Sequence, residues 1–196
     1  MFTGIVEAVG TLAEVKSTAG GYRVRIETPL SSHMKEGDSL AVSGVCLTVI
    51  VIDGDDVLAD IGPETARVTT LGALQRGQRV NLERPMLSDG RVDGHFVLGH
   101  VDGVGVIEHI KQEGESHWLT VSFSLALAPY FIRKGSIAVD GISLTVAGLG
   151  EDRFDVMVIP YTWAHTTLGT LKKGDKVNLE CDMIGKYVVR AMELRQ

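Results

Sequence analysis

The fold of this chain is decided by a stretch that occurs twice, as Ser39-Leu-Ala-Val-Ser-Gly-Val-Cys-Leu-Thr-Val49 and again as Ser136-Ile-Ala-Val-Asp-Gly-Ile-Ser-Leu-Thr-Val146. The two copies lie 97 residues apart, and seven of their eleven positions are identical. The same offset aligns Pro63–Glu83 with Pro160–Glu180, where twelve of 21 positions match. The sequence therefore contains an internal duplication, and this repeat predicts the domain organisation of the chain.

The beginnings of the two copies also correspond, because Phe2-Thr3-Gly4 pairs with Val101-Asp102-Gly103 at an offset of 99. Three aligned blocks in one order are more than a chance likeness of strand composition. They predict a first domain over residues 1–90 and a second over residues 91–185. Residues 186–196 form a terminal segment, whose helix starts as early as residue 182.

Short runs of β-branched and apolar residues, separated by glycines, fill both halves of the chain. Residues 118 to 123 alternate, with Leu119, Val121 and Phe123 on one face and polar or aromatic side chains on the other. Many short alternating runs between turn residues are typical of an all-β barrel or sandwich. The predicted strands are Ser39–Ile52, Arg79–Glu83, Trp118–Phe123, Ile137–Val146, Phe154–Ile159 and Lys176–Cys181.

The end of the chain has the one clear helical pattern. From Asp182 to Gln196, apolar residues recur at spacings of three and four, and Asp182 stands where a helix N-cap would be. The apolar stripe consists of Ile184, Tyr187, Val188, Ala191 and Met192. An exposed stripe of this kind needs a partner to cover it.

Composition excludes several classes of protein. The 196 residues include 25 acidic and 19 basic side chains, a formal net charge of −6, which argues against binding nucleic acid or anionic membranes by bulk electrostatics. The longest uncharged apolar stretch, Leu40–Ile52, is too short to span a bilayer, and the N-terminus does not resemble a secretory signal. Cys46 and Cys181 form no CxxC pair, so we expect no disulfide framework and a cytoplasmic location.

The repeat places small polar residues at matching positions. Cys46 and Thr48 point to one face of a strand, as do Ser143 and Thr145 in the second copy. Such pairs are satisfied by the sheet or bind a ligand, and their recurrence at one register supports the ligand. The glycines of the repeat, at positions 44 and 141, let a ligand or another backbone approach closely or mark a bulge.

Other site patterns fail on inspection. Asp93, His95, His100 and Asp102 lie near one another in sequence, but their spacing does not fit a metal site. His100 beside Asp102 still suits proton transfer or the orientation of a polar ligand. No dinucleotide-binding, P-loop or nucleophile-elbow pattern is present in the sequence.

The motifs taken together resemble the riboflavin synthase family. They are Met-Phe-Thr-Gly-Ile-Val-Glu at residues 1–7, Gly-Val-Cys-Leu-Thr-Val at 44–49, Gly-His-Val-Asp-Gly at 99–103 and Asp-Gly-Ile-Ser-Leu-Thr-Val at 140–146. Each motif alone is weak, but all stand in the expected order and spacing from Met1 to about Lys186. The resemblance implies two six-stranded antiparallel Greek-key barrels and a C-terminal helix used to form a homotrimer.

The resemblance also implies a reaction that explains the duplication. Two molecules of 6,7-dimethyl-8-ribityllumazine react by transfer of a four-carbon unit, giving riboflavin and 5-amino-6-ribitylamino-uracil. The working site lies between the first domain of one subunit and the second domain of its neighbour, and only one such site is fully formed at a time. No metal or cofactor is implied, because the lumazine ring is itself the electron sink. Association with lumazine synthase is a further partner that the resemblance allows.

Site residues follow from the same resemblance, position by position. The implied catalytic set is Phe2, Thr3, Cys46, His100, Ser143, Thr145 and Asp182. In the first half, the lumazine-binding residues are Gly4, Ile5, Val6, Cys46, Leu47, Thr48, Asp60, Ile61, Gly62, Pro63, Glu64 and Thr65. In the second half they are Gly99, His100, Val101, Lys134, Ser143, Leu144, Thr145, Ile159, Pro160, Tyr161, Thr162, Trp163 and Ala164. We expect His100 and Ser143 to handle protons, with Cys46 and Thr48 lining the opposing half-site.

Some positions depart from the family pattern, and one other function remains open. Asp93 stands where a second glycine is common, and Tyr161 and Trp163 replace the more usual residues of their segment. The alternative function is a lumazine- or flavin-binding protein without turnover, such as the antenna proteins of luminous bacteria. Those relatives have altered several of the motif residues that this chain retains. A flavin reductase would need a nicotinamide domain, for which the chain has no room.

Overall fold

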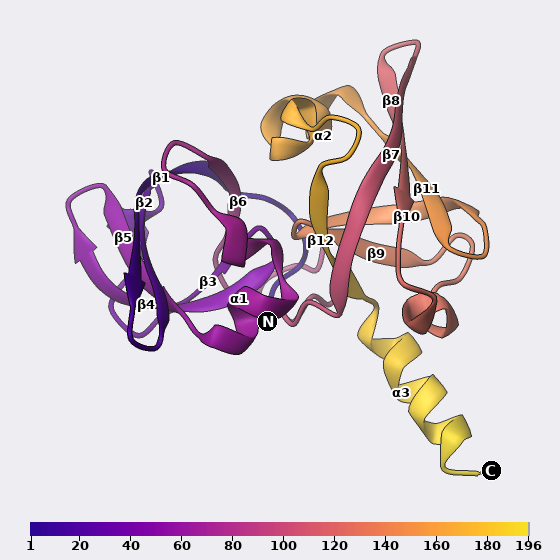
Figure 1. The fold of residues 1–196 in the computed structure, drawn as a ribbon, viewed down its shortest axis with the longest axis horizontal. Helices are drawn as coiled ribbons and strands as arrows, with labels where there is room; N and C mark the ends of the chain where they lie inside the picture. The colour runs from indigo at the N-terminus through magenta and orange to yellow at the C-terminus, as the bar shows by residue number, and fades with distance from the viewer. Residues whose placement is uncertain (196) are drawn as a thin grey trace.

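Each half of the chain folds into a closed six-stranded antiparallel barrel, as the computed structural model of residues 1–195 shows (Figure 1). The first barrel contains β1 (Ala8–Thr18), β2 (Gly21–Glu27), β3 (Ser39–Val42), β4 (Val45–Asp53), β5 (Asp56–Ile61) and β6 (Arg79–Glu83). The second contains β7 (Gly103–Glu113), β8 (Ser116–Ser122), β9 (Ser136–Val139), β10 (Ile142–Leu149), β11 (Arg153–Val158) and β12 (Lys176–Cys181). Short helices join β5 to β6 and β11 to β12, namely α1 (Pro63–Val68), η2 (Thr70–Ala73), α2 (Pro160–His165) and η4 (Thr167–Thr170). The remaining helices are η1 (Ser31–His33), η3 (Leu125–Tyr130) and α3 (Met183–Glu193).

Strand order is the same in both barrels. In the first it runs β1-β2-β5-β4-β3-β6, so β2 pairs with β5 and β3 with β6 in a Greek-key arrangement. Each barrel has its own apolar interior, because alternate residues of every strand point inward. In β8, Leu119 and Val121 lie in that interior while Thr120 and Ser122 are half-exposed, as the alternation predicts. The predicted all-β fold of two tandem barrels and a terminal helix is confirmed.

The repeated stretch is a hairpin rather than one continuous strand, and here the predicted run of residues 39–52 was wrong. The chain reverses at Ser43-Gly44, where φ is 44° and 79°, and at Asp140-Gly141, where φ is 45° and 77°. Two consecutive residues with positive φ form the two-residue turn that best matches the twist of paired strands. The Asp-Gly pair is a strong hairpin signal that the sequence did contain.

The two barrels meet at these two turns, and the contacts between the turns are reciprocal. A Cβ atom on Gly44 would lie 2.6 Å from the Gly141 nitrogen, so only glycine allows the two backbones to approach. Asn81 and Asn178 repeat one another across the contact. The Nδ2 group of Asn81 donates to the Asp140 carbonyl, and that of Asn178 donates to the Ser43 carbonyl. The glycines therefore serve backbone contact between the barrels.

Two short segments cross between the barrels: the N-terminal arm (residues 2–6) and the linker arm (residues 97–101). Phe2 and Val97 pair as an antiparallel bridge, and Phe2 is fully buried in one apolar cluster with Ala41, Val97 and Ala138. The arms correspond at an offset of 95, so the pairing of residues 2–4 with 101–103 was wrong. The offset changes to 97 further on because the connection from β8 to β9 is longer than that from β2 to β3.

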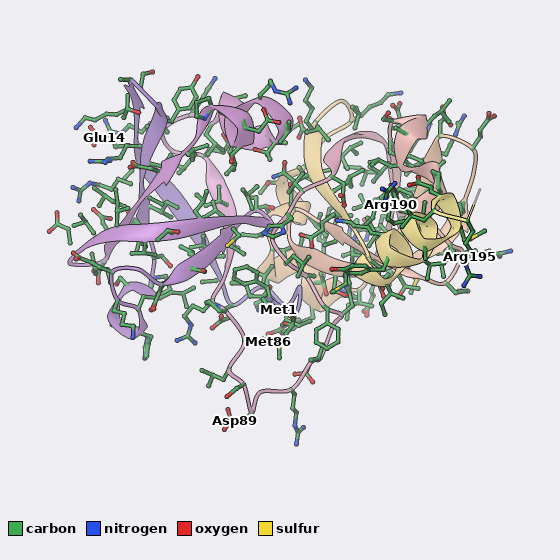
Figure 2. The ribbon with its side chains drawn as sticks, turned by 90° about the horizontal axis from the view of Figure 1, so that it is seen from below. Met1, Glu14, Met86, Asp89, Arg190 and Arg195 are labelled. Atoms are coloured by element: carbon green, nitrogen blue, oxygen red, sulfur yellow. The ribbon has the colours of Figure 1, made fainter. Side chains whose placement is uncertain are left out.

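Figure 2 shows where the arms begin. Met1 lies beside Met86, whose N–H donates to the Met1 carbonyl over 3.0 Å, and the connector around Asp89 loops away from both barrels. This connector leads from the end of β6 to the linker arm. After the connector, the chain passes between the two barrels as the linker arm and then begins β7 of the second barrel.

Helix α3 begins where the sequence predicts. The Asp182 carboxylate accepts a hydrogen bond from the Ile184 N–H over 3.0 Å, which is an N-cap. Lys186 holds the helix to the second barrel through an ion pair of 2.6 Å with Asp102. The helix then extends away from both barrels (Figure 1). No helix among residues 1–195 is long and apolar enough to cross a membrane.

The wild-type protein is expected to become less stable as pH rises, because Asp140 loses its proton. We expect Asp140→Asn to abolish this pH dependence of stability. Burial raises the pKa of Asp140 from its ordinary 3.8 to about 7. Between these two pH values the folded protein holds a proton that the unfolded chain has released, so the stability falls as pH increases. Asparagine keeps an oxygen to accept the Asn178 N–H, which now donates to Asp140 Oδ1 over 2.8 Å. Thermal unfolding of both proteins at pH 5 and pH 8 tests this, and equal changes in the two melting temperatures would contradict it.

Candidate active site

A cavity of about 390 Å³ on the outside of the second barrel gathers six of the thirteen predicted second-half residues. It lies over β10 and β11 and the start of α2. Its lining consists of Lys134, Ser143, Leu144, Thr145, Ala147, Met157, Ile159 and Thr162. All of these except Ala147 and Met157 were predicted. The repeat could have indicated Met157, which aligns with the predicted residue Asp60 at the offset of 97.

The alternation along β10 explains which side chains reach this cavity. Ile142 and Val146 point into the apolar interior of the barrel, whereas Ser143 and Thr145 point outward. The same alternation in β4 leaves Cys46 half-buried and Thr48 exposed. The repeated polar pairs therefore face away from the barrel interiors, toward a position where a ligand can bind.

Lys134 occupies a strained backbone position at the edge of the cavity. Its φ is 68°, in the left-handed region, whereas its counterpart in the first barrel is Gly37, with φ of 90°. A non-glycine residue there costs roughly 1–2 kcal/mol. Strain retained in one copy of a repeat and absent from the other is typical of a functional position.

His95, which the sequence analysis did not include in the site, lies against Ser143. Its Nδ1 atom is 2.7 Å from the Ser143 hydroxyl oxygen. Burial lowers the pKa of His95, and the nearby negative charge of Asp182 opposes part of that shift. A neutral histidine bonded to a hydroxyl and facing a carboxylate is able to accept a proton. The repeat gave no signal for His95, because no residue of the first half corresponds to it.

Among residues 1–195, no hydrogen bond joins His100 to Ser143. His100 lies in the linker arm, its side chain is exposed, and its N–H donates to Glu180 over 2.9 Å. The hydrogen bonds therefore place His95, rather than His100, at Ser143. Within one chain, His100 therefore lies apart from this hydrogen bond, and the proton-handling roles of His100 and Ser143 stay predictions.

The N-terminal arm supports the site from the other side. The Gly4 carbonyl accepts the Ser143 N–H over 2.8 Å, and the Thr3 carbonyl accepts the His95 N–H over 3.1 Å. The Thr3 hydroxyl donates to Glu83 over 2.7 Å. Thr3 is thus buried beneath the site, with its hydroxyl already bonded.

The corresponding face of the first barrel has charged residues in ion pairs among its predicted site positions. Asp60 forms an ion pair with Arg23 over 2.7 Å, and Glu64 forms one with Arg67 over 2.6 Å. The Cys46 N–H donates to the Gly99 carbonyl over 2.9 Å. The remaining positions predicted around it, namely Thr48, Gly62, Pro63 and Thr65, lie on β4 and at the start of α1.

Several predicted residues face the protein interior or lie outside the cavity lining. Leu47 and Ile61 belong to the core of the first barrel, and Val101 packs against that core. Val6 packs against the core of the second barrel, whereas Ile5 is exposed. Their proposed contacts with the lumazine remain predictions.

The unusual aromatic residues of α2 form two stacked pairs. Trp163 stacks on His117, with ring centroids 3.9 Å apart, and Tyr161 stacks on His165 at 4.1 Å. Of the segment from Tyr161 to Ala164, Thr162 is the member that lines the cavity. The two aromatic departures from the family pattern thus each stack on a histidine near the cavity.

Other features of the described chain do not compete with this site. Residues 1–195 contain no group of three or more His, Cys, Asp or Glu side chains suited to a metal ion. A larger cavity of about 770 Å³ lies between the barrels, lined by residues such as Arg79 and Lys176, and none of the predicted site residues lines it. The smaller cavity instead gathers one lysine and three hydroxyl side chains, and His95 is bonded to one of these hydroxyls.

Comparisons with known proteins agree with the repeat. The family model described as the lumazine binding domain matches twice, over residues 3–85 and 98–182. The riboflavin synthase of Bacillus amyloliquefaciens is 43% identical over 191 residues, covering 97% of this chain and 89% of that protein. The riboflavin synthase of Mycobacterium bovis is 44% identical over 199 residues, covering 98% of each chain.

Among solved structures, LumP complexed with riboflavin superposes with a TM-score of 0.86 at 28% identity, covering 92% of this chain and 99% of that one. LumP complexed with 6,7-dimethyl-8-(1'-D-ribityl) lumazine gives a TM-score of 0.84 at 27% identity, with the same coverage of both chains. The identity to the synthases is higher and extends over nearly the whole chain. With two lumazine-binding domains and this similarity, the chain belongs to the riboflavin synthase family of transferases.

Proposed function

We propose that this enzyme converts two molecules of 6,7-dimethyl-8-ribityllumazine into riboflavin and 5-amino-6-ribitylamino-uracil. The observation that carries the proposal is the 2.7 Å contact between His95 and Ser143 beside the cavity of the second barrel. A site that only held a chromophore would not need a half-buried histidine with a lowered pKa. The similarity of the chain to riboflavin synthases supports the same reaction.

The chemistry requires one lumazine to lose a proton from a methyl carbon. Neutral His95 accepts this proton in our proposal, with Asp182 stabilising the imidazolium that forms. The negative charge that develops on the ring is balanced by the ammonium of Lys134 and by hydroxyl donors of the cavity. The second barrel thus holds the lumazine that is deprotonated.

The second lumazine, in this proposal, binds at Cys46 and Thr48 on the first barrel of a neighbouring subunit. The exposed apolar stripe of α3 supports such an assembly, which we propose is a homotrimer. Fixing two large rings face to face replaces a bimolecular encounter by a defined geometry, which supplies much of the acceleration. The two products contain all atoms of the two substrates, so the reaction needs no oxidant or cofactor.

Purified protein incubated with 6,7-dimethyl-8-ribityllumazine alone tests the proposed function. We expect riboflavin and the uracil in equal amounts, followed by absorbance and by quantification of both products. Tight binding without riboflavin would favour the alternative of a non-catalytic binding protein, which the likeness to LumP keeps worth testing. The cytoplasmic location and an association with lumazine synthase stay predictions.

Replacing Lys134 by glycine is expected to separate stability from binding. Glycine at φ of 68° relieves the backbone, as at Gly37, so we expect the unfolding free energy to stay constant or rise by up to about 1 kcal/mol. We expect lumazine affinity to fall by about tenfold, or roughly 1.4 kcal/mol, because a cation of the cavity is lost. Denaturant unfolding and ligand titration measure the two quantities. Lower stability with unchanged affinity would show that Lys134 has no role in binding.

A further inference from the structure

We infer that Glu83 and Glu180 are positioning residues, each holding a crossing arm so that one barrel supports the ligand site of the other. This inference rests on the proposed function for the meaning of the two sites. The hydrogen bonds that carry it do not depend on that function. They form two matching sets, one for each arm.

Glu83, at the end of β6 in the first barrel, holds the N-terminal arm. Its Oε1 atom accepts the Thr3 N–H over 2.6 Å and the Thr3 hydroxyl over 2.7 Å, and its Oε2 accepts the Gly4 N–H over 3.0 Å. The carbonyls of the same two residues accept the N–H groups of His95 and Ser143. A carboxylate of the first barrel therefore fixes the histidine and the serine that serve the second.

Glu180, at the matching position of β12 in the second barrel, holds the linker arm. It accepts the N–H groups of Leu98, Gly99 and His100 over 2.6, 2.9 and 2.9 Å. The Gly99 carbonyl then accepts the Cys46 N–H over 2.9 Å. A carboxylate of the second barrel therefore fixes the polar strand of the first.

The close packing of the arms makes their position critical. A Cβ atom on Gly4 would lie 2.7 Å from the Ser143 Cβ, and one on Gly99 would lie 2.5 Å from the Cys46 Cβ. Neither arm is a strand of a barrel, so its backbone depends on the glutamate and on the Phe2–Val97 bridge. A shift of an arm must therefore move the strand residue that it contacts.

Glutamine cannot replace either carboxylate without loss. Both oxygens of Glu83 accept hydrogen bonds, and both oxygens of Glu180 do so as well. An amide offers one acceptor oxygen, and its NH₂ group would face a backbone N–H. Both glutamates are at least 94% buried, so solvent cannot easily supply the missing partner.

The test compares Glu83→Gln with Glu180→Gln by amide hydrogen exchange at two residues. If the arms act as proposed, Glu83→Gln speeds exchange at the Ser143 amide and leaves the Cys46 amide unchanged. Glu180→Gln has the reverse effect. Glu7→Gln, which breaks the more exposed ion pair with Arg84, is the matched control and should change neither amide. General destabilisation would speed exchange at both amides in both variants, and that result would overturn the inference.

Turnover gives a second readout. We expect Glu83→Gln to lower kcat by about tenfold to a hundredfold, because a small displacement of catalytic groups has effects of this size. If Glu83→Gln does not fold, Thr3→Val removes one of the bonds to Glu83 and should show a smaller effect at the same amide. A wild-type protein that makes no riboflavin but shows the crossed exchange pattern would refute the proposed function alone. An active wild type with uncrossed exchange would refute the positioning role alone.

Discussion

His95→Gln is expected to lower kcat for riboflavin formation by about 10²- to 10⁴-fold, the range typical of losing a general base. The glutamine side chain keeps a polar contact with the Ser143 hydroxyl but cannot take up a proton at neutral pH. Because the lumazine-binding side chains of the cavity remain, we expect ligand affinity to change by less than about threefold. Steady-state kinetics and ligand titration of the same preparation measure both quantities.

The pH dependence gives an independent check of the same residue. The pKa of His95 is lowered from 6.5 by burial, so the neutral form persists below that pH. The acid limb of the kcat/KM profile of the wild type should therefore lie below pH 6.5, and it should be absent from the residual activity of His95→Gln.

His100→Gln separates the two histidines. If that variant loses the large factor while His95→Gln stays active, the proton is handled from the linker arm, and the contact between His95 and Ser143 is structural. Comparable folding of both variants must be established by circular dichroism, since both residues lie close to buried backbone hydrogen bonds.

Charging the apolar stripe of α3 is expected to dissociate the assembly and to abolish most turnover. Tyr187 and Val188 are 71% and 53% exposed in the single chain. Burial of such side chains against a partner stabilises by roughly 1.5–3 kcal/mol each, so the double variant Tyr187→Asp, Val188→Asp should weaken association by at least about a hundredfold. Sedimentation should then show monomers that bind lumazine but form riboflavin slowly. Truncation after Asp182 should have the same effect.

Arg190→Gln is the matched control for this experiment. Arg190 is on the same helix, outside the stripe, and pairs with Glu193 over 3.0 Å at the surface. Its loss should leave both the sedimentation coefficient and the turnover unchanged. A trimer that persists in the charged double variant would show that other surfaces hold the subunits together.

The architecture of this protein was predictable from its amino-acid sequence. Two signals were sufficient to predict two β-domains. The alternation of residues 118–122 depends only on neighbours in the sequence, and the matching blocks 97 residues apart show directly that the domain is duplicated. The helix from Met183 and its Asp182 cap were predicted for the same reason, since capping depends on neighbours two residues apart. Most of the lining of the second-barrel cavity followed from motifs on β10 and α2.

Which distant residues share the site depends on tertiary contacts. His95, Thr3 and Ser143 are brought together by backbone hydrogen bonds between an arm, a connector and a strand, and no local pattern encodes those contacts. His95 lies at Ser143 because its N–H donates to Thr3, whereas the N–H of His100 donates to Glu180, 80 residues away. Arms that are not strands have no periodicity to predict, so their positions depend on buried acceptors supplied by the rest of the fold.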